Sequence, residues 1–145
     1  MASQKDIKLA SDLRTTVTRL IKKLRKESVT SQSLSLTERS TLALLDQHAE
    51  MLPNELAAME KITTQSMSQI LAHLLELGYI NRRISVQDKR KAIISLSEAG
   101  STILYQVRNE RDEWLNKALK DSCSAEEREL LMKALVPLTK LIDFE

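Results

Sequence analysis

The residues best suited to binding chemistry form a basic cluster just past the middle of the chain. Positions 81–91 contain five basic side chains and one acid: Arg82, Arg83, Asp88, Lys89, Arg90 and Lys91. Lysine and arginine bind phosphate oxygens, and a charged loop can also enter the narrow minor groove of DNA. Because Asp88 lies two positions before Arg90, we expect its carboxylate to orient that guanidinium through a charge-assisted pair. The alternative is a solvated basic loop without a partner.

A second polar set precedes this cluster, on a stretch whose apolar residues recur at helical spacing. Met67, Leu71 and Leu74 belong to the apolar stripe. Away from the stripe, or bordering it, lie Thr64, Gln65, Ser66, Ser68, Gln69 and, farther along the outer side, His73. Glutamine can form two hydrogen bonds with adenine, and serine accepts several base edges. These polar residues are therefore candidate DNA contacts, unless they are only the solvated face of an amphipathic helix.

Start and stop signals for helices surround these candidates. Ser35 with Glu38 forms a capping box, as does Ser124 with Glu127, and Thr63 or Thr64 can cap the helix that carries the polar set. Gly78 is placed to end that helix. We predict helices at about 6–27, 35–48, 54–60, 64–77, 98–119 and 125–142, and a loop at 28–35. Pro137 is expected to kink or break the last helix.

The hydrophobic pattern changes period after Gly78. Residues 79–84 and 92–96 are short strand candidates, and the polar, mostly basic segment 85–91 connects them. They predict a β-hairpin with a charged tip. A short helix, a turn, a second helix, a glycine and a hairpin follow one another in the order of a winged helix-turn-helix. The expected fold class is mainly α with a small two-stranded β wing (α+β).

Composition excludes several other classes of protein. The chain is 42% hydrophobic and 29% charged but only 3% aromatic, and two glycines and two prolines are too few for a many-stranded sandwich or barrel. There is no glycine-rich phosphate loop. His48 and His73 lie far apart and Cys123 is the single cysteine, so we expect no metal site, no cofactor and no enzyme. No run of ~20 apolar residues suits a membrane span, and the N-terminus lacks a signal-peptide core, so a cytoplasmic location is expected.

The terminal helices carry more apolar surface than a small winged unit can cover. We therefore expect residues 1–34 to be a dimerisation helix and loop, residues 35–99 the DNA-binding domain, and residues 100–145 further dimerisation helices. A two-fold homodimer presents two recognition helices about one DNA turn apart, ~34 Å, to a pseudo-palindromic site. Packing of all six helices within one chain is the alternative.

The chain resembles the MarR family of bacterial transcription regulators in three segments: TQSMSQILAHLLELGYINR at residues 64–82, Asp88-Lys-Arg90, and Leu96-Ser-Glu-Ala-Gly100. The resemblance implies that Ser66, Ser68 and Gln69 sit where bases or phosphates are usually contacted. It also implies that Asp88 and Arg90 are the paired acidic and basic residues of the wing. Members of this family are homodimers joined by their terminal helices. They often release DNA when a small phenolic or lipophilic effector binds between those helices and the winged domain.

These observations predict a sequence-specific transcription regulator that binds double-stranded DNA, namely a repressor released by a small-molecule effector. Residues 61–96 carry six basic residues against two acids in a chain whose net charge is only +2, which indicates a localised anionic partner. The alternative is a protein-interaction module that uses the winged helix as a scaffold and touches an acidic partner with its wing. Salt-dependent binding to DNA distinguishes the two.

Overall fold

Ten elements follow one another along residues 1–28 and 30–145, the part of the chain that the computed structural model describes. The elements in chain order are α1 (Gln4–Glu27), η1 (Thr30–Ser33), α2 (Leu36–His48), β1 (Glu50–Met51), α3 (Pro53–Glu60), α4 (Thr64–Glu76), β2 (Ile80–Ile84), β3 (Ala92–Leu96), α5 (Glu98–Ser122) and α6 (Ala125–Ile142). The segment predicted as a loop contains the short 3-10 helix η1 instead, while Val29 lies outside the described residues.

Local capping signals set the helix boundaries as predicted. The Ser35–Glu38 and Ser124–Glu127 capping boxes both form, and the Thr63 hydroxyl accepts a hydrogen bond from the Ser66 N–H at 3.0 Å. Each cap satisfies a backbone donor that has no partner inside its helix. Gly78 follows α4 with φ +80°, a left-handed conformation that favours glycine. Helix α6 continues through Pro137, so the chain does not break there.

The wing contains the predicted hairpin and one strand more. β2 and β3 pair antiparallel with Arg82 opposite Ile94, and β1 pairs with the other edge of β3, placing Glu50 opposite Ser95. The sheet therefore has three strands in the order β1-β3-β2 rather than the expected two. β1 is only two residues long, so no alternating pattern in the sequence could indicate that it pairs.

The core lies inside the winged unit, between α2, α3, α4, the sheet and the start of α5. Its fully buried side chains include Leu42, Leu45, Leu56, Met67, Leu74 and Ile94. Gly100 closes this core, because a Cβ there would lie 1.9 Å from the carbonyl oxygen of Tyr79. The absence of a side chain lets the first turn of α5 pack directly on the turn that follows α4.

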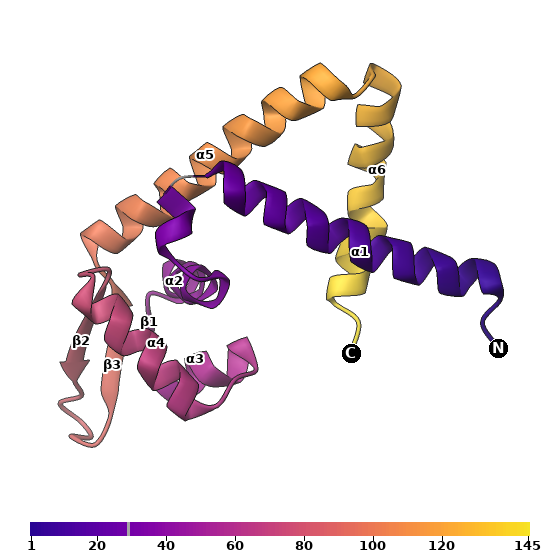
Figure 1. Cartoon of the computed structure of the whole chain (residues 1–145). Coiled ribbons are helices and arrows are strands. Elements are labelled where there is room, and N and C mark those ends of the chain that lie inside the picture. The colour runs from indigo at the N-terminus through magenta and orange to yellow at the C-terminus, as the bar shows by residue number, and fades with distance from the viewer. Residues whose placement is uncertain (29) are drawn as a thin grey trace.

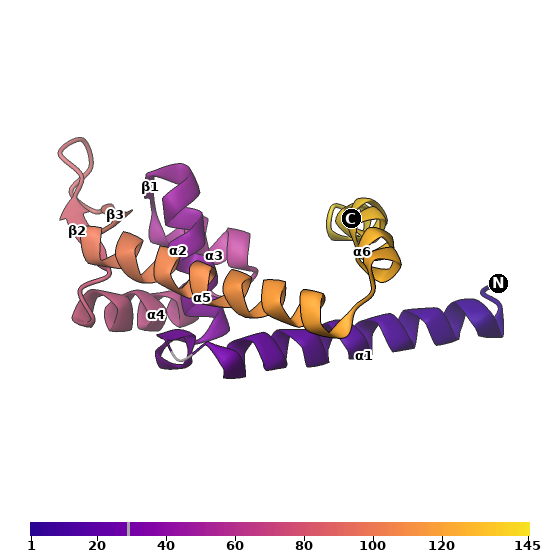
Figure 2. The same ribbon diagram turned by 90° about the horizontal axis from the view of Figure 1, so that it is seen from above.

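The terminal helices extend away from the winged unit (Figure 1). α5 leads outward from the wing, and α6 crosses α1 near the middle of α1 in this view. Figure 2, turned by 90°, shows that α6 and α1 are separated in space where they cross in Figure 1. Neither helix has a buried residue. Their exposed apolar side chains include Ile7, Leu9, Leu20, Leu130, Leu135 and Leu141.

Candidate nucleic-acid interface

Helix α4 presents its predicted polar face to solvent. Thr64, Gln65, Ser66, Ser68 and Gln69 are all exposed, while Met67, Leu71 and Leu74 are buried on the opposite face. The sequence therefore placed the two faces correctly. Thr63 caps the N-terminal end of the helix, and its exposed first turns can reach into a major groove.

The polar side chains on this face differ in whether they are hydrogen-bonded within the chain. The Ser68 hydroxyl donates to the Thr64 carbonyl oxygen at 2.9 Å, and Ser66 pairs with the Thr63 hydroxyl at 2.9 Å. The side-chain amides of Gln65 and Gln69 make no hydrogen bond within the described part of the chain. The two glutamine amides can therefore offer both a donor and an acceptor to a base edge.

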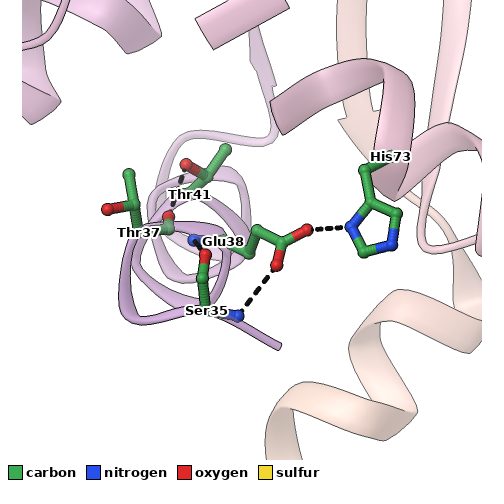
Figure 3. Close-up of polar contacts among 5 residues, drawn as sticks. All are labelled: Ser35, Thr37, Glu38, Thr41 and His73. Carbon is green, nitrogen blue, oxygen red and sulfur yellow. Dashed lines mark hydrogen bonds and ion pairs between the residues drawn. The ribbon is translucent and has the colours of Figure 1, made fainter. Parts of the chain in front are cut away.

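His73 faces a neighbouring helix rather than only solvent. Its Nδ1 contacts Glu38 Oε2 on α2, as Figure 3 shows, and the ring's other nitrogen points away from that carboxylate. The Glu38 side chain is only 9% exposed, and its Oε1 accepts a hydrogen bond from the Ser35 N–H at 2.8 Å. The hydrogen bond and the negative charge of Glu38 raise the pKa of His73. His73 thus connects α4 to the capping box of α2.

The wing tip contains the predicted pair of Asp88 and Arg90. Asp88 Oδ1 accepts hydrogen bonds from the Arg90 backbone N–H at 3.1 Å and from Arg90 Nε at 3.2 Å. Both hydrogen bonds lower the pKa of Asp88, and the one from the Arg90 side chain has the larger effect. The Arg90 side chain is nevertheless 91% exposed. Its guanidinium is held from one side and open to an anion on the other.

The remaining basic residues of the cluster differ in their surroundings. Arg83 Nη2 donates to the carboxylate of Glu50 on β1, at 3.0 and 3.1 Å. Arg82, its neighbour on β2, lies beside α4 and lines a cavity of about 230 Å³ together with Ser68. Lys89 and Lys91 are exposed at the tip. Arg82 therefore lies beside Ser68 of α4, whereas the carboxylate of Glu50 neutralises Arg83.

A further charged site lies where α2 meets α5. A cavity of about 350 Å³ is lined by both Arg39 and Arg111, with Leu36, Leu104 and Val107 among its apolar walls. Arg39 Nε and Arg111 Nε and Nη2 are buried, and none has a hydrogen-bond partner among the described residues. Burial, together with the charges of Arg111 and Arg25, lowers the pKa of Arg39 to about 10. Both guanidiniums remain protonated at neutral pH.

Sequence reasoning missed this arginine pair, because the two residues lie on different helices far apart in the chain. One signal was present: Arg111 interrupts the apolar stripe of its helix, at the spacing of Leu104 and Val107. A cation within a buried stripe is costly unless something compensates its charge.

Two other classes of site are not found in the described part of the chain. No group of three or more histidine, cysteine, aspartate or glutamate side chains could hold a metal ion there. None of its helices is long and apolar enough to cross a bilayer.

Known proteins resemble the chain both in sequence and in structure. The model of the MarR family matches residues 34–92. An uncharacterized HTH-type transcriptional regulator of Mycobacterium leprae is 33% identical over 138 residues, which is 95% of each chain. A crystal structure from Pseudomonas aeruginosa, of a protein provisionally named a transcriptional regulator, is 32% identical with a TM-score of 0.86, over 99% of this chain and 100% of the other.

The same fold recurs at lower identity. A single-residue mutant of MepR from Staphylococcus aureus, solved bound to an oligodeoxyribonucleotide, has a TM-score of 0.69 at 20% identity, covering 92% of this chain and 97% of that one.

Proposed function

The chain belongs to the MarR family of transcriptional regulators, and we propose that it represses transcription by binding a specific pseudo-palindromic DNA duplex as a homodimer. One observation carries the proposal: the exposed face of α4, with the unengaged Gln65 and Gln69, lies beside a wing whose Arg90 is braced by Asp88. Such a surface can read base edges with the helix and bind phosphates with the wing. The MepR structure with a bound oligodeoxyribonucleotide shares this fold.

The dimer part of the proposal rests on α1 and α6. Both helices expose large apolar side chains, including Leu9 at 66% and Leu130 at 67%. A water-facing apolar surface of this extent is typical of a protein interface. Residues 1–34 and 100–145 serve as dimerisation segments in this proposal, and residues 35–99 form the DNA-binding unit. The protein works in the cytoplasm, where a bacterium keeps its DNA.

Sequencing the genomic fragments that the protein retains from its host's DNA tests the proposal. The expected result is enrichment of a short inverted repeat whose half-sites are centred about 10 base pairs apart. Uniform recovery of fragments would contradict sequence-specific binding. If the protein retained no DNA but captured an acidic protein through its wing, the interaction-module alternative would replace the proposal.

The effector that releases the DNA is proposed to be a small anion with an apolar body, which includes phenolates and lipophilic carboxylates. The cavity between α2 and α5 supports this proposal: Arg39 and Arg111 offer unpaired donors, and Leu36, Leu104 and Val107 offer an apolar wall. A carboxylate can accept two parallel hydrogen bonds from one guanidinium. Because α2 belongs to the winged unit and α5 leads to the dimerisation helices, a ligand between them can change how the two recognition helices are spaced.

Benzoate and the neutral benzamide form a matched pair of probes for this cavity. Benzoate should raise the melting temperature of the protein and weaken its binding to the retained duplex, while benzamide at the same concentration should do neither. Equal effects of the two compounds would contradict recognition of the negative charge.

A further inference from the structure

Glu38 and His73 link the two helices that set the orientation of the DNA-reading face. Glu38 lies in the first turn of α2, where it completes the capping box with Ser35. His73 lies on α4, and the two side chains meet between the helices (Figure 3). Glu38 is buried within this junction, with a residue exposure of 7%. A buried carboxylate needs hydrogen bonds or an opposite charge to compensate for its lost hydration.

The position of His73 on α4 connects this contact to DNA recognition. Gln65, Gln69 and His73 are spaced four residues apart, so they occupy successive turns on one side of the helix. The contact at His73 therefore acts, together with the buried face of Met67, Leu71 and Leu74, on how far α4 is rotated about its own axis. The rotation decides where the amides of Gln65 and Gln69 point.

We propose that His73 is a positioning residue whose protonated ring, held by Glu38, keeps α4 in the orientation that reads DNA, so that specific affinity decreases as pH rises and the ring loses its proton. This inference rests on the proposed function, because it assumes that α4 reads DNA. It assigns His73 a role different from the direct DNA contact expected from the sequence.

The charges around the ring set the direction of the effect. The hydrogen bond and charge of Glu38 raise the pKa of His73 most, and Glu76 on the same helix raises it further. These two acids are the charged groups that act on the ring within the described residues; α3 and β2, which also pack against α4, add none. Because the folded pKa lies above the ordinary value of 6.5, the contact is fully formed below pH 6.5. Its contribution is lost as pH rises through the raised pKa.

The neutral ring can still donate one hydrogen bond to Glu38, but without the assistance of charge. A charge-assisted hydrogen bond is roughly twice as strong as a neutral one. We therefore expect a decrease in specific affinity of about three- to tenfold across the titration, without a loss of folding.

The experiment uses the full chain and a duplex selected by that chain from a random-sequence pool at pH 6.0. The dissociation constant of the complex with this duplex is measured from pH 5.5 to 8.5 at fixed ionic strength, for the parent and three variants. His73→Gln should have a flat profile. Glu38→Gln keeps an acceptor for the Ser35 N–H but removes the charge, so its inflection should move down towards the ordinary histidine value. His48→Gln is the matched control, because His48 is the chain's other histidine and is exposed; its profile should follow the parent.

Two further measurements separate positioning from direct contact. If the protonated ring bound a phosphate itself, His73→Gln would lower the slope of log affinity against log salt by about one. Positioning predicts an unchanged slope and a smaller ratio of affinities for selected over random DNA. Proton NMR of the two histidine rings reports the His73 titration without DNA, so it tests the contact even if Glu38→Gln fails to fold.

A pH-independent affinity in the parent would overturn this inference and leave the proposed function standing. A pH profile of His73→Gln that matches the parent would also overturn the inference. A lower salt slope for His73→Gln would do the same. If the pool yielded no bound duplex at any pH, the proposed function would fall, and this inference would fall with it.

Discussion

At the tip of the wing, the carboxylate of Asp88 holds Arg90 by both the backbone and the side chain of that arginine. One carboxylate oxygen, Oδ1, accepts from the Arg90 backbone N–H at 3.1 Å and from Nε at 3.2 Å. The acid also orders the turn itself, because its own N–H donates to Ser85 Oγ at 3.2 Å. The acidic residue of this basic wing therefore orients the guanidinium of Arg90.

Asp88→Ala is expected to weaken DNA binding, although it removes a negative charge from the proposed DNA-binding surface. Without the brace, the Arg90 side chain has more rotamer freedom to lose on binding. The long-range benefit of deleting an acid is screened within ~10 Å at 0.1 M salt, whereas the loss of a contact is not. Fluorescence anisotropy at 0.1 and 0.2 M salt should show the same deficit at both. Binding equal to or tighter than that of the parent would contradict the bracing role.

Arg90→Ala provides the comparison for that variant. It should weaken binding to selected and random duplexes alike and lower the salt slope by about one for a lost phosphate contact. Lys117→Ala is a suitable control, because Lys117 is also exposed but lies near the C-terminal end of α5, away from both the wing and α4. If Arg90→Ala bound DNA like the parent, the wing would not be a DNA contact.

Gln65→Ala and Gln69→Ala are expected to reduce specificity rather than general affinity. Each should cost about 1–3 kcal/mol on the cognate duplex if its amide reads a base edge. Affinity for random DNA should change little, since these side chains are uncharged. Titration of both duplexes with each variant gives the ratio directly. Equal losses on the two duplexes would show that the glutamines do not read sequence.

Gly100→Ala is expected to destabilise the winged unit by about 1–3 kcal/mol, the usual cost of inserting a methyl group into a well-packed site. The added Cβ would lie 1.9 Å from the Tyr79 carbonyl oxygen, so backbone must move. Gly78→Ala meets no atom within 4 Å and suffers only from its φ of +80°, at a cost of about 1–2 kcal/mol. Urea unfolding of both variants compares the two. A Gly100→Ala protein as stable as the parent would contradict the close approach.

Arg111→Met is expected to raise the free energy of unfolding by about 1 kcal/mol and to abolish the effect of benzoate, because it replaces a half-buried guanidinium, two of whose nitrogens lack a hydrogen-bond partner, with an apolar side chain. Arg108→Met is the contrasting variant. Arg108 lines the same cavity but pairs with Asp46 at 3.5 Å, so its loss should not stabilise the protein. A destabilised Arg111→Met would show that the cation is compensated in the native protein.

The features that could be predicted from the sequence depend on neighbours along the chain. The Ser35–Glu38 box, the cap at Thr63 and the glycine at 78 act within one helical turn, so the start of α2 and both ends of α4 could be located without any tertiary information. The pairing of Asp88 with Arg90 belongs to the same class, because the two residues are separated by only one other.

The features that sequence reasoning missed join residues that are distant in the chain. β1 is too short to show a period, and it becomes a strand only because β3 offers an open edge. The contact of His73 with Glu38 and the meeting of Arg39 with Arg111 depend on how α2 packs against α4 and α5. No local spacing indicates such contacts, so the sequence suggests a DNA contact for His73 and no role for Arg39.

The most direct test of the central claim is the ratio of the protein's affinity for a genomic site that it selects to its affinity for the same bases in shuffled order. The ratio is measured at 0.15 M salt, with the mass of the complex determined by light scattering. The account predicts a preference of about a thousandfold or more and a complex containing two 16.5 kDa chains per duplex. Equal affinity for the two duplexes, or one chain bound per site, would contradict it.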